Sequence, residues 1–174
     1  MCGFVGFVDP SLPGGASPEP VVRAMAATLA RRGPDDEGFW GDSSVGVQLG
    51  FRRLAILDLS QAGHQPMVSH SGRYVLVFNG EVYNFKELRR ELGPSAGPYR
   101  GDSDTEVLLA AFEAWGPREA VTRFRGMFAF ALYDTREREL WLARDRMGIK
   151  PLYVAGDGSW LAFGAELRSL LPHP

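Results

Sequence analysis

The chain has 174 residues, of which 45% are hydrophobic and 23% are charged, a mixture typical of a folded globular domain rather than of a disordered or fibrous protein. Its formal charge of −2 and its lack of a Lys/Arg run argue against a nucleic-acid partner, because phosphate binding requires clustered positive charge. No apolar stretch approaches the roughly 20 residues that span a bilayer, and the start lacks the basic region of a signal peptide. No membrane partner is therefore expected, and the cytoplasm is the expected location.

The first half of the chain alternates apolar strand patterns with loops rich in Gly, Pro and Ser. Residues 4–8 are β-branched or aromatic and end at an Asp-Pro pair, which predicts a short buried strand. Ser17 can cap a helix with Pro18 at its first position, and apolar residues at helical spacing extend it to about residue 32. Further strands are expected at residues 45–51, 54–57 and 74–78.

The second half contains helices followed by neighbouring strands. A short helix is predicted at residues 85–92, and another begins at Ser103 or Asp104 and continues to Trp115. The remaining expected elements are strands at 127–133 and 140–143, short β segments near 153 and at 160–163, and a short helix at 165–171. Neighbouring strands with grouped helices predict an α+β domain with antiparallel sheet over residues 1–174, and residues 172–174 are interpreted as the start of a linker.

Cys2 is the single cysteine, which excludes an intrachain disulfide, and it is the first candidate catalytic residue. Removal of Met1 would leave a thiol and an α-amine on one residue. Their ordinary pKa values, about 8.5 and about 7.7–8.0, let the amine serve as the base for the thiol, directly or through a water. Such a site needs no catalytic histidine. The alternative is that Cys2 is merely a small apolar start to a strand.

The segment Phe-Asn-Gly-Glu at residues 78–81 follows an apolar strand. An Asn-Gly pair alone is typical of a hairpin turn. It can also stabilise the oxyanion that forms when an amide carbonyl is attacked, with the Asn79 side chain as one donor and the unobstructed Gly80 N–H as the other. The residues alone leave both interpretations open.

Two charged residues could bind the two ends of an α-amino acid. Strand alternation places Arg52 and Arg53 on opposite faces, so at most one is expected to enter a cleft, where a guanidinium grips a carboxylate with two hydrogen bonds. Asp104 lies at a predicted helix start, where an acidic residue commonly caps the helix, but it could instead neutralise an ammonium group. Arg53 and Asp104 together would suit a zwitterion.

Other polar features favour ordinary structural roles. His64 and His70 lack metal-ligand spacing, and Asp145, between Arg144 and Arg146, is interpreted as an ion-paired turn. The phosphate-binding patterns G-x-x-x-x-G-K-[ST] and G-x-G-x-x-G are missing.

Several motifs together resemble the class II glutamine amidotransferase domain of the asparagine synthetase family, which belongs to the N-terminal-nucleophile hydrolases. They are MCGFVGF, RRGPDDEG, RRLAILDLS, NGEVYNFKELR, SDTEVLL, FRGMFAFALYD, ARDRMGIKPLY and FGAELRSLL. They keep their order and cover essentially the whole chain. The resemblance implies a four-layer αββα fold, with two antiparallel sheets between helices.

The resemblance also implies roles for individual residues. Cys2 would be the nucleophile, and Asn79 with Gly80 would form the oxyanion hole. The implied glutamine pocket consists of Arg53 for the α-carboxylate, Asp104 for the α-ammonium, and Leu54, Ile56 and Glu81 as lining residues. Glutamine would be cleaved through a Cys2 thioester, and residues 59–65 are expected to close over it.

The implied partners are L-glutamine and an ATP-dependent synthetase domain or subunit that receives the ammonia. No Ser-Gly-Gly phosphate loop of that second domain is present, so ATP and Mg are expected only there, and no metal or cofactor is expected here. The nitrogen acceptor stays open between aspartate and another carboxylate, and a homodimer stays open. The alternatives are another N-terminal-nucleophile amidase or peptidase, or a non-catalytic module of the same fold.

Overall fold

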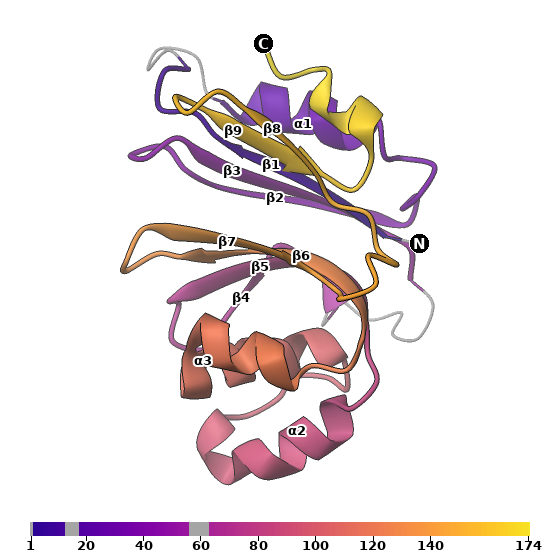
Figure 1. Cartoon of the computed structure of the whole chain (residues 1–174), viewed down its shortest axis with the longest axis vertical. Helices are drawn as coiled ribbons and strands as arrows, with labels where there is room; N and C mark the ends of the chain where they lie inside the picture. The colour runs from indigo at the N-terminus through magenta and orange to yellow at the C-terminus, as the bar shows by residue number, and fades with distance from the viewer. Residues whose placement is uncertain (1, 13–17, 56–62) are drawn as a thin grey trace. The chain divides into compact units, whose positions relative to one another are not determined.

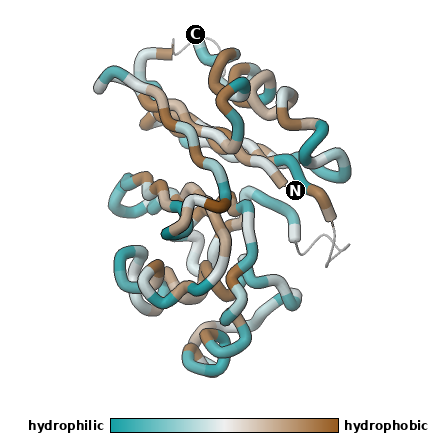
Figure 2. Tube along the Cα trace, turned by 45° about the vertical axis from the view of Figure 1, so that its right-hand side comes forward, coloured by the Kyte–Doolittle hydropathy of each residue, from teal (hydrophilic) through white to brown (hydrophobic). Residues whose placement is uncertain are grey.

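The computed structural model describes residues 2–12, 18–55 and 63–174, without the side chain of Ser95, and it divides into two compact units (Figure 1). The first unit comprises Met1–Ala55 with Pro151–Pro174, and the second comprises Ile56–Lys150. In Figure 2, hydrophobic stretches follow the strands, whereas many connecting loops are hydrophilic. Each unit is described by itself.

The first unit is a five-stranded antiparallel sheet with helix α1 (Glu19–Ala27) on one face. Its strands, in spatial order, are β2 (Asp36–Asp42), β3 (Val47–Arg53), β1 (Gly3–Val8), β9 (Leu161–Gly164) and β8 (Tyr153–Gly156). Alternation along β1 turns Val5 and Phe7 toward Val22 and Met25 of α1, and these four side chains are fully buried. This apolar layer fixes the first unit.

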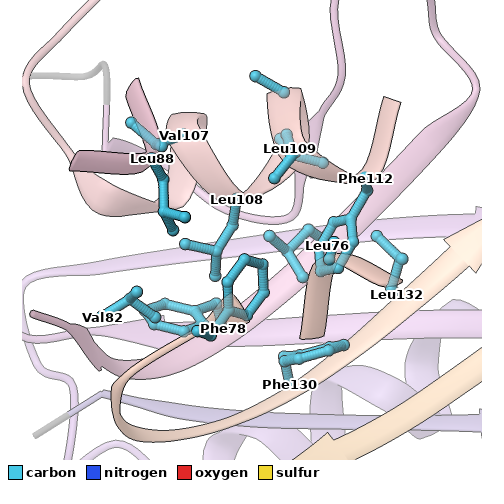
Figure 3. Packing of buried hydrophobic residues seen from close by; sticks show 14 of the residues in the cluster. Leu76, Phe78, Val82, Leu88, Val107, Leu108, Leu109, Phe112, Phe130 and Leu132 are labelled. Carbon is cyan, nitrogen blue, oxygen red and sulfur yellow. The ribbon is translucent and has the colours of Figure 1, made fainter. Parts of the chain in front are cut away.

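The second unit is a four-stranded antiparallel sheet whose helices cover one face. Its strands, in spatial order, are β4 (Met67–Val68), β5 (Tyr74–Val82), β6 (Gly126–Asp134) and β7 (Glu139–Arg144). Helix α3 (Asp104–Arg123) packs on β5, and α2 (Phe85–Leu92) with the 3-10 turn η2 (Gly93–Ala96) packs on α3. Leu76 and Phe78 of β5 meet Leu108 and Phe112 of α3 in the core of this unit (Figure 3).

Several predicted boundaries were wrong. Helix α1 ends at Ala27, and residues 28–32 continue as turns. Strand β5 continues four residues past Phe78, α3 continues past a break at Gly116, and only the 3-10 turn η3 (Leu167–Leu170) forms where a helix was expected at 165–171. No strand forms at 54–55, and residues 56–57 lie outside the described ranges. The break in α3 occurs because Gly116 has φ +75°, outside the helical region, and precedes a proline.

The interpretation of residues 172–174 as the start of a linker is not supported. The His173 side chain is 2% exposed and lies 3.5 Å from the Asp9 carboxylate. Its ring stacks on Trp160 at 4.9 Å and meets the edge of Phe7 at 5.0 Å. The end of the described chain therefore packs onto the first unit.

The interpretation of Asp145 as an ion-paired turn was wrong. Its buried carboxylate instead accepts hydrogen bonds from backbone N–H groups, and no ion pair to it occurs among the described residues. The donors are Phe128, Met147, Ile149 and Lys150, at 2.9–3.2 Å. Burial acts to raise the pKa of Asp145, but these N–H groups outweigh it and hold the pKa below the usual value. One carboxylate thus fixes the backbone of residues 145–150.

Candidate active site

Cys2 lies directly before β1 in the first unit and is half-buried. The β1–β3 register pairs Gly3 with Arg52, so the next step along the chain brings Cys2 alongside Arg53 and Leu54. The Leu54 N–H donates to Cys2 Sγ at 3.4 Å, and Sγ lies 3.6 Å from the Leu54 carbonyl oxygen. The thiol is thereby held at the end of β3.

The backbone of Cys2 is held by Arg32, for which the sequence analysis predicts no role. Arg32 Nε donates to the Cys2 carbonyl oxygen at 3.3 Å, and Arg32 Nη1 forms an ion pair with Glu166 at 3.0 Å. Burial acts to raise the pKa of Glu166, but hydrogen bonds from Arg32 and Arg168 lower it overall. The RRGPDDEG motif contains Arg32, yet its contacts 30 and 134 residues away along the chain leave no local signal.

Arg53 ends β3 and is 9% exposed, whereas Arg52 forms a 3.0 Å ion pair with Glu37 of β2. The prediction that these two arginines lie on opposite faces agrees with this difference. The backbone at Arg53 is also fixed, since its carbonyl accepts the Asp35 N–H at 3.0 Å and the Asp35 carboxylate accepts the Ala55 N–H at 2.8 Å. The first unit therefore brings Cys2, Arg53 and Leu54 together.

Asn79 and Gly80 lie within β5 of the second unit, opposite Ala129 and Phe128 of β6. They are not in a hairpin turn, so the alternative interpretation of this Asn-Gly pair was wrong. The Asn79 side chain is 3% exposed, and its Nδ2 has no hydrogen-bond acceptor among the described residues. A buried donor without an acceptor is rare in folded proteins and calls for an explanation.

Gly80 allows β5 to approach β6 closely. A Cβ at this position would lie 2.3 Å from the Met127 carbonyl oxygen and 2.6 Å from Phe128 Cα, both of which are backbone atoms that cannot move aside easily. No side chain other than hydrogen fits here without a shift of the sheet. The glycine is therefore required by the strand pairing itself.

Alternate N–H groups of β5 face its outer edge. Strand β4 pairs with only two residues near the start of β5, so side chains serve the later positions. The Phe78 N–H donates to Gln65 Oε1 at 2.6 Å, and the Val82 N–H donates to Asp104 Oδ2 at 2.9 Å. Alternation turns the Gly80 N–H, midway between these two, to the same edge. This edge therefore offers a backbone donor beside the Asn79 amide.

Asp104 is the first residue of α3 and is half-buried. Burial raises the pKa of its carboxyl, the N–H groups of Val82 and Thr105 oppose that rise, and the nearby Glu81 carboxylate adds to it. Glu81 itself is exposed on β5. The second unit therefore brings Asn79, Gly80, Glu81 and Asp104 together.

The remaining predicted pocket residue, Ile56, lies outside the described residues, as do residues 59–62 of the loop expected to close over glutamine. Within residues 2–12, 18–55 and 63–174, no cluster of three or more His, Cys, Asp or Glu side chains is suited to hold a metal ion. None of the helices in those ranges has the length and apolar character required to cross a membrane.

The sequence profile described as "Glutamine amidotransferase domain" matches residues 1–174. The chain belongs to the glutamine amidotransferase domain family. It is therefore an enzyme domain whose chemistry is the hydrolysis of glutamine for ammonia transfer, as the resemblance predicted.

Three relatives of this amidotransferase domain show how it compares with known proteins. It is 45% identical over 184 residues to a putative glutamine-hydrolysing asparagine synthetase of Mycobacterium tuberculosis, a match that covers 98% of this chain and 28% of the relative. It is 42% identical over 172 residues to asparagine synthetase 1 of Bacillus subtilis, covering 98% and 27%. The solved glutamine phosphoribosylpyrophosphate amidotransferase of B. subtilis has a TM-score of 0.77 at 20% identity, covering 97% of this chain and 43% of that chain.

The likeness to the solved structure concerns the fold alone and confirms the predicted α+β, N-terminal-nucleophile fold of the amidotransferase domain. The domain spans little more than a quarter of the length of the curated relatives that it matches.

Proposed function

We propose that this domain hydrolyses L-glutamine to L-glutamate and ammonia through a Cys2 thioester, and that the ammonia serves an ATP-dependent amidation of the asparagine-synthetase type. The observation that carries the proposal is the pair of neighbouring donors on β5: the Asn79 amide, which has no acceptor in the part of the chain that the structure describes, and the edge-facing Gly80 N–H. An oxyanion hole requires donors of this kind that are not already used by the protein.

Substrate binding uses the two charged residues. Arg53 binds the α-carboxylate of glutamine, and Asp104 binds its α-ammonium, with Leu54, Ile56 and Glu81 lining the pocket. The ionised form of Asp104 is required, and the Val82 N–H at 2.9 Å favours that form against burial.

The reaction begins when the α-amine of Cys2, free after removal of Met1, takes the thiol proton. The thiolate attacks the side-chain carbonyl carbon, and Asn79 with Gly80 stabilise the oxyanion. The C–N bond breaks as the proton passes from the amine to the leaving nitrogen, which departs as ammonia and leaves a γ-glutamyl thioester. Water, deprotonated by the same amine, then attacks the thioester carbonyl. The C–S bond breaks, glutamate leaves, and the Cys2 thiolate takes the proton back from the amine. Arg32 positions the nucleophile by holding the Cys2 carbonyl.

The domain itself uses no metal or cofactor for these steps, whereas ATP and Mg belong to the synthetase domain or subunit that receives the ammonia. The two curated relatives described above are named as glutamine-hydrolysing asparagine synthetases, one of them putative, which supports aspartate as the acceptor. The cytoplasm is the proposed location. A panel of carboxylate acceptors, assayed with glutamine and ATP, would identify a different acceptor.

Intact-mass analysis before and after treatment with a diazo-ketone analogue of glutamine tests the proposal. We expect the mass of a chain without Met1, and one covalent adduct that peptide mapping places on Cys2. The Cys2→Ser variant should take no adduct. A chain that retains Met1 and still releases ammonia from glutamine at full speed would refute the mechanism.

A further inference from the structure

Met147 and Ile149 are exposed apolar side chains on a loop with a fixed backbone. Their exposed fractions are 84% and 59%. The buried Asp145 carboxylate accepts the N–H groups of both residues, at 3.1 Å and 2.9 Å, and that of Lys150 at 3.0 Å. Because this backbone is ordered when the domain folds, a partner that buries the two side chains incurs little further cost in backbone conformational entropy.

Three arginines lie close to this apolar pair along the chain or through contacts of the loop, and they are called its basic rim. Arg125, Arg144 and Arg146 are exposed, and none of them has an ion-pair partner within the described ranges. Arg146 donates to the Phe124 carbonyl at 3.3 Å, which keeps its guanidinium next to Arg125. An apolar centre with a charged rim is the usual anatomy of a specific protein interface, and the rim selects a partner of opposite charge.

We propose that this surface binds the ATP-dependent synthetase domain or subunit. Met147 and Ile149 would enter an apolar pocket of the partner, and the rim of Arg125, Arg144 and Arg146 would face carboxylates at the edge of that pocket. This inference rests on the proposed function. The two curated relatives described above are named as asparagine synthetases, and this domain spans only 28% and 27% of them. The partner that must receive ammonia is therefore the occupant for which such a surface is required. Ammonia that left an undocked domain would be lost to solvent.

The test uses the complete glutamine-dependent synthetase that contains this domain, with the M147E/I149E double variant. Three rates are measured: glutamate formation from glutamine, amide product from glutamine, and amide product from added ammonium. We expect the ratio of amide product to glutamate to fall about tenfold or more, because buried charge at an interface centre is severely disruptive. Glutamate formation and the ammonium-dependent rate should stay within about twofold of wild type, since neither side chain packs inside the domain.

Two further variants sharpen the result. V68E introduces the same charge at a 44% exposed apolar position on β4 and should leave all three rates unchanged. R125E should also lower the ratio of amide product to glutamate, and its effect should shrink as salt is added, because exposed charges are screened.

The outcomes separate the two proposals. A wild-type enzyme that forms no glutamate from glutamine refutes the proposed function, whatever the loop does. A double variant that transfers nitrogen as well as wild type overturns the docking surface alone. Loss of glutamate formation in the double variant also overturns it, because the loop would then serve glutamine hydrolysis itself.

Discussion

Asn79→Ala should separate catalysis from stability. The Asn79 Nδ2 is buried without an acceptor among the described residues, and such a donor costs about 1–3 kcal/mol of folding free energy. Its removal offsets the packing lost on truncation, typically about 1 kcal/mol, so the free energy of unfolding should change by less than about 1 kcal/mol. For a chain of this size that corresponds to a shift in Tm of at most about 2–4 °C. Loss of an oxyanion donor should nevertheless lower kcat by about 10²–10³, or about 2.7–4 kcal/mol.

Asn84 in the same NGEVYN motif is the matched control. Its Nδ2 donates to the Arg123 carbonyl at 3.0 Å, and its Oδ1 accepts the Arg125 N–H at 2.9 Å. Each hydrogen bond contributes about 0.5–1.5 kcal/mol, and one of these is exposed, so Asn84→Ala should destabilise the domain by about 1–2 kcal/mol. Its glutaminase rate at a temperature well below Tm should stay within about threefold of wild type.

The assay pairs urea unfolding with the rate of glutamate release for both variants. Asn79→Asp adds an isosteric side chain that keeps the shape but has no N–H donor, and it should lose kcat as Asn79→Ala does. A loss of more than about 3 kcal/mol in Asn79→Ala would show that its amide is structural. Near-normal turnover in that variant would refute its place in the oxyanion hole.

Three further predictions follow from single contacts. Gly80→Ala should lower Tm and kcat together, since its Cβ would lie 2.3 Å from a carbonyl oxygen of β6; a variant with wild-type Tm and kcat would contradict this. Because burial raises the pKa of Asp104, kcat/KM should fall on acidification at a pH above about 3.9, the usual pKa of aspartate. Asp104→Asn should raise KM and remove this fall in kcat/KM from the pH profile. The lowered pKa of Asp145 means that its contribution to stability is present above about pH 3.9 and is lost as pH falls through the folded pKa; urea unfolding of Asp145→Asn should show a weaker loss of stability in acid than wild type.

The sequence predicted helices and strands well where the spacing of apolar residues agreed with the residues that typically begin or end such elements. Helix α2 begins and ends where expected, at Phe85–Leu92, because its apolar stripe lies between the Asn84 turn and Gly93. Strand β2, Asp36–Asp42, was missed because DEGFWGD carries acidic and glycine residues rather than a strand pattern. It forms because it pairs along the full length of β3, a long-range interaction that propensity does not contain.

In the candidate site too, local sequence signals predicted some features, and others depend on long-range contacts. The Asn79-Gly80 pair and Asp104 could be selected from their chemistry, but the contact between Asp104 and the Val82 N–H spans 22 residues and follows only from the packing of α3 on β5. The role of Arg32 depends on a carbonyl 30 residues away and could not be predicted. The chemistry of the residues identifies candidates for the site, whereas tertiary contacts determine which of their hydrogen-bonding atoms have no partner within the described residues.

The open edge of β5 gives a physical reason for the position of the proposed oxyanion hole. An unpaired strand edge exposes N–H groups that attract other strands, and proteins usually cover them. Here Gln65 and Asp104 cover the N–H groups on either side of Gly80 with side-chain oxygens, and β4 stops short of them. A β-strand paired with this edge in place of these side chains would also have accepted a hydrogen bond from the Gly80 N–H. Within the described residues, covering the edge one group at a time leaves the Gly80 N–H beside an asparagine donor that has no acceptor there. A transient negative charge is the ligand suited to both donors.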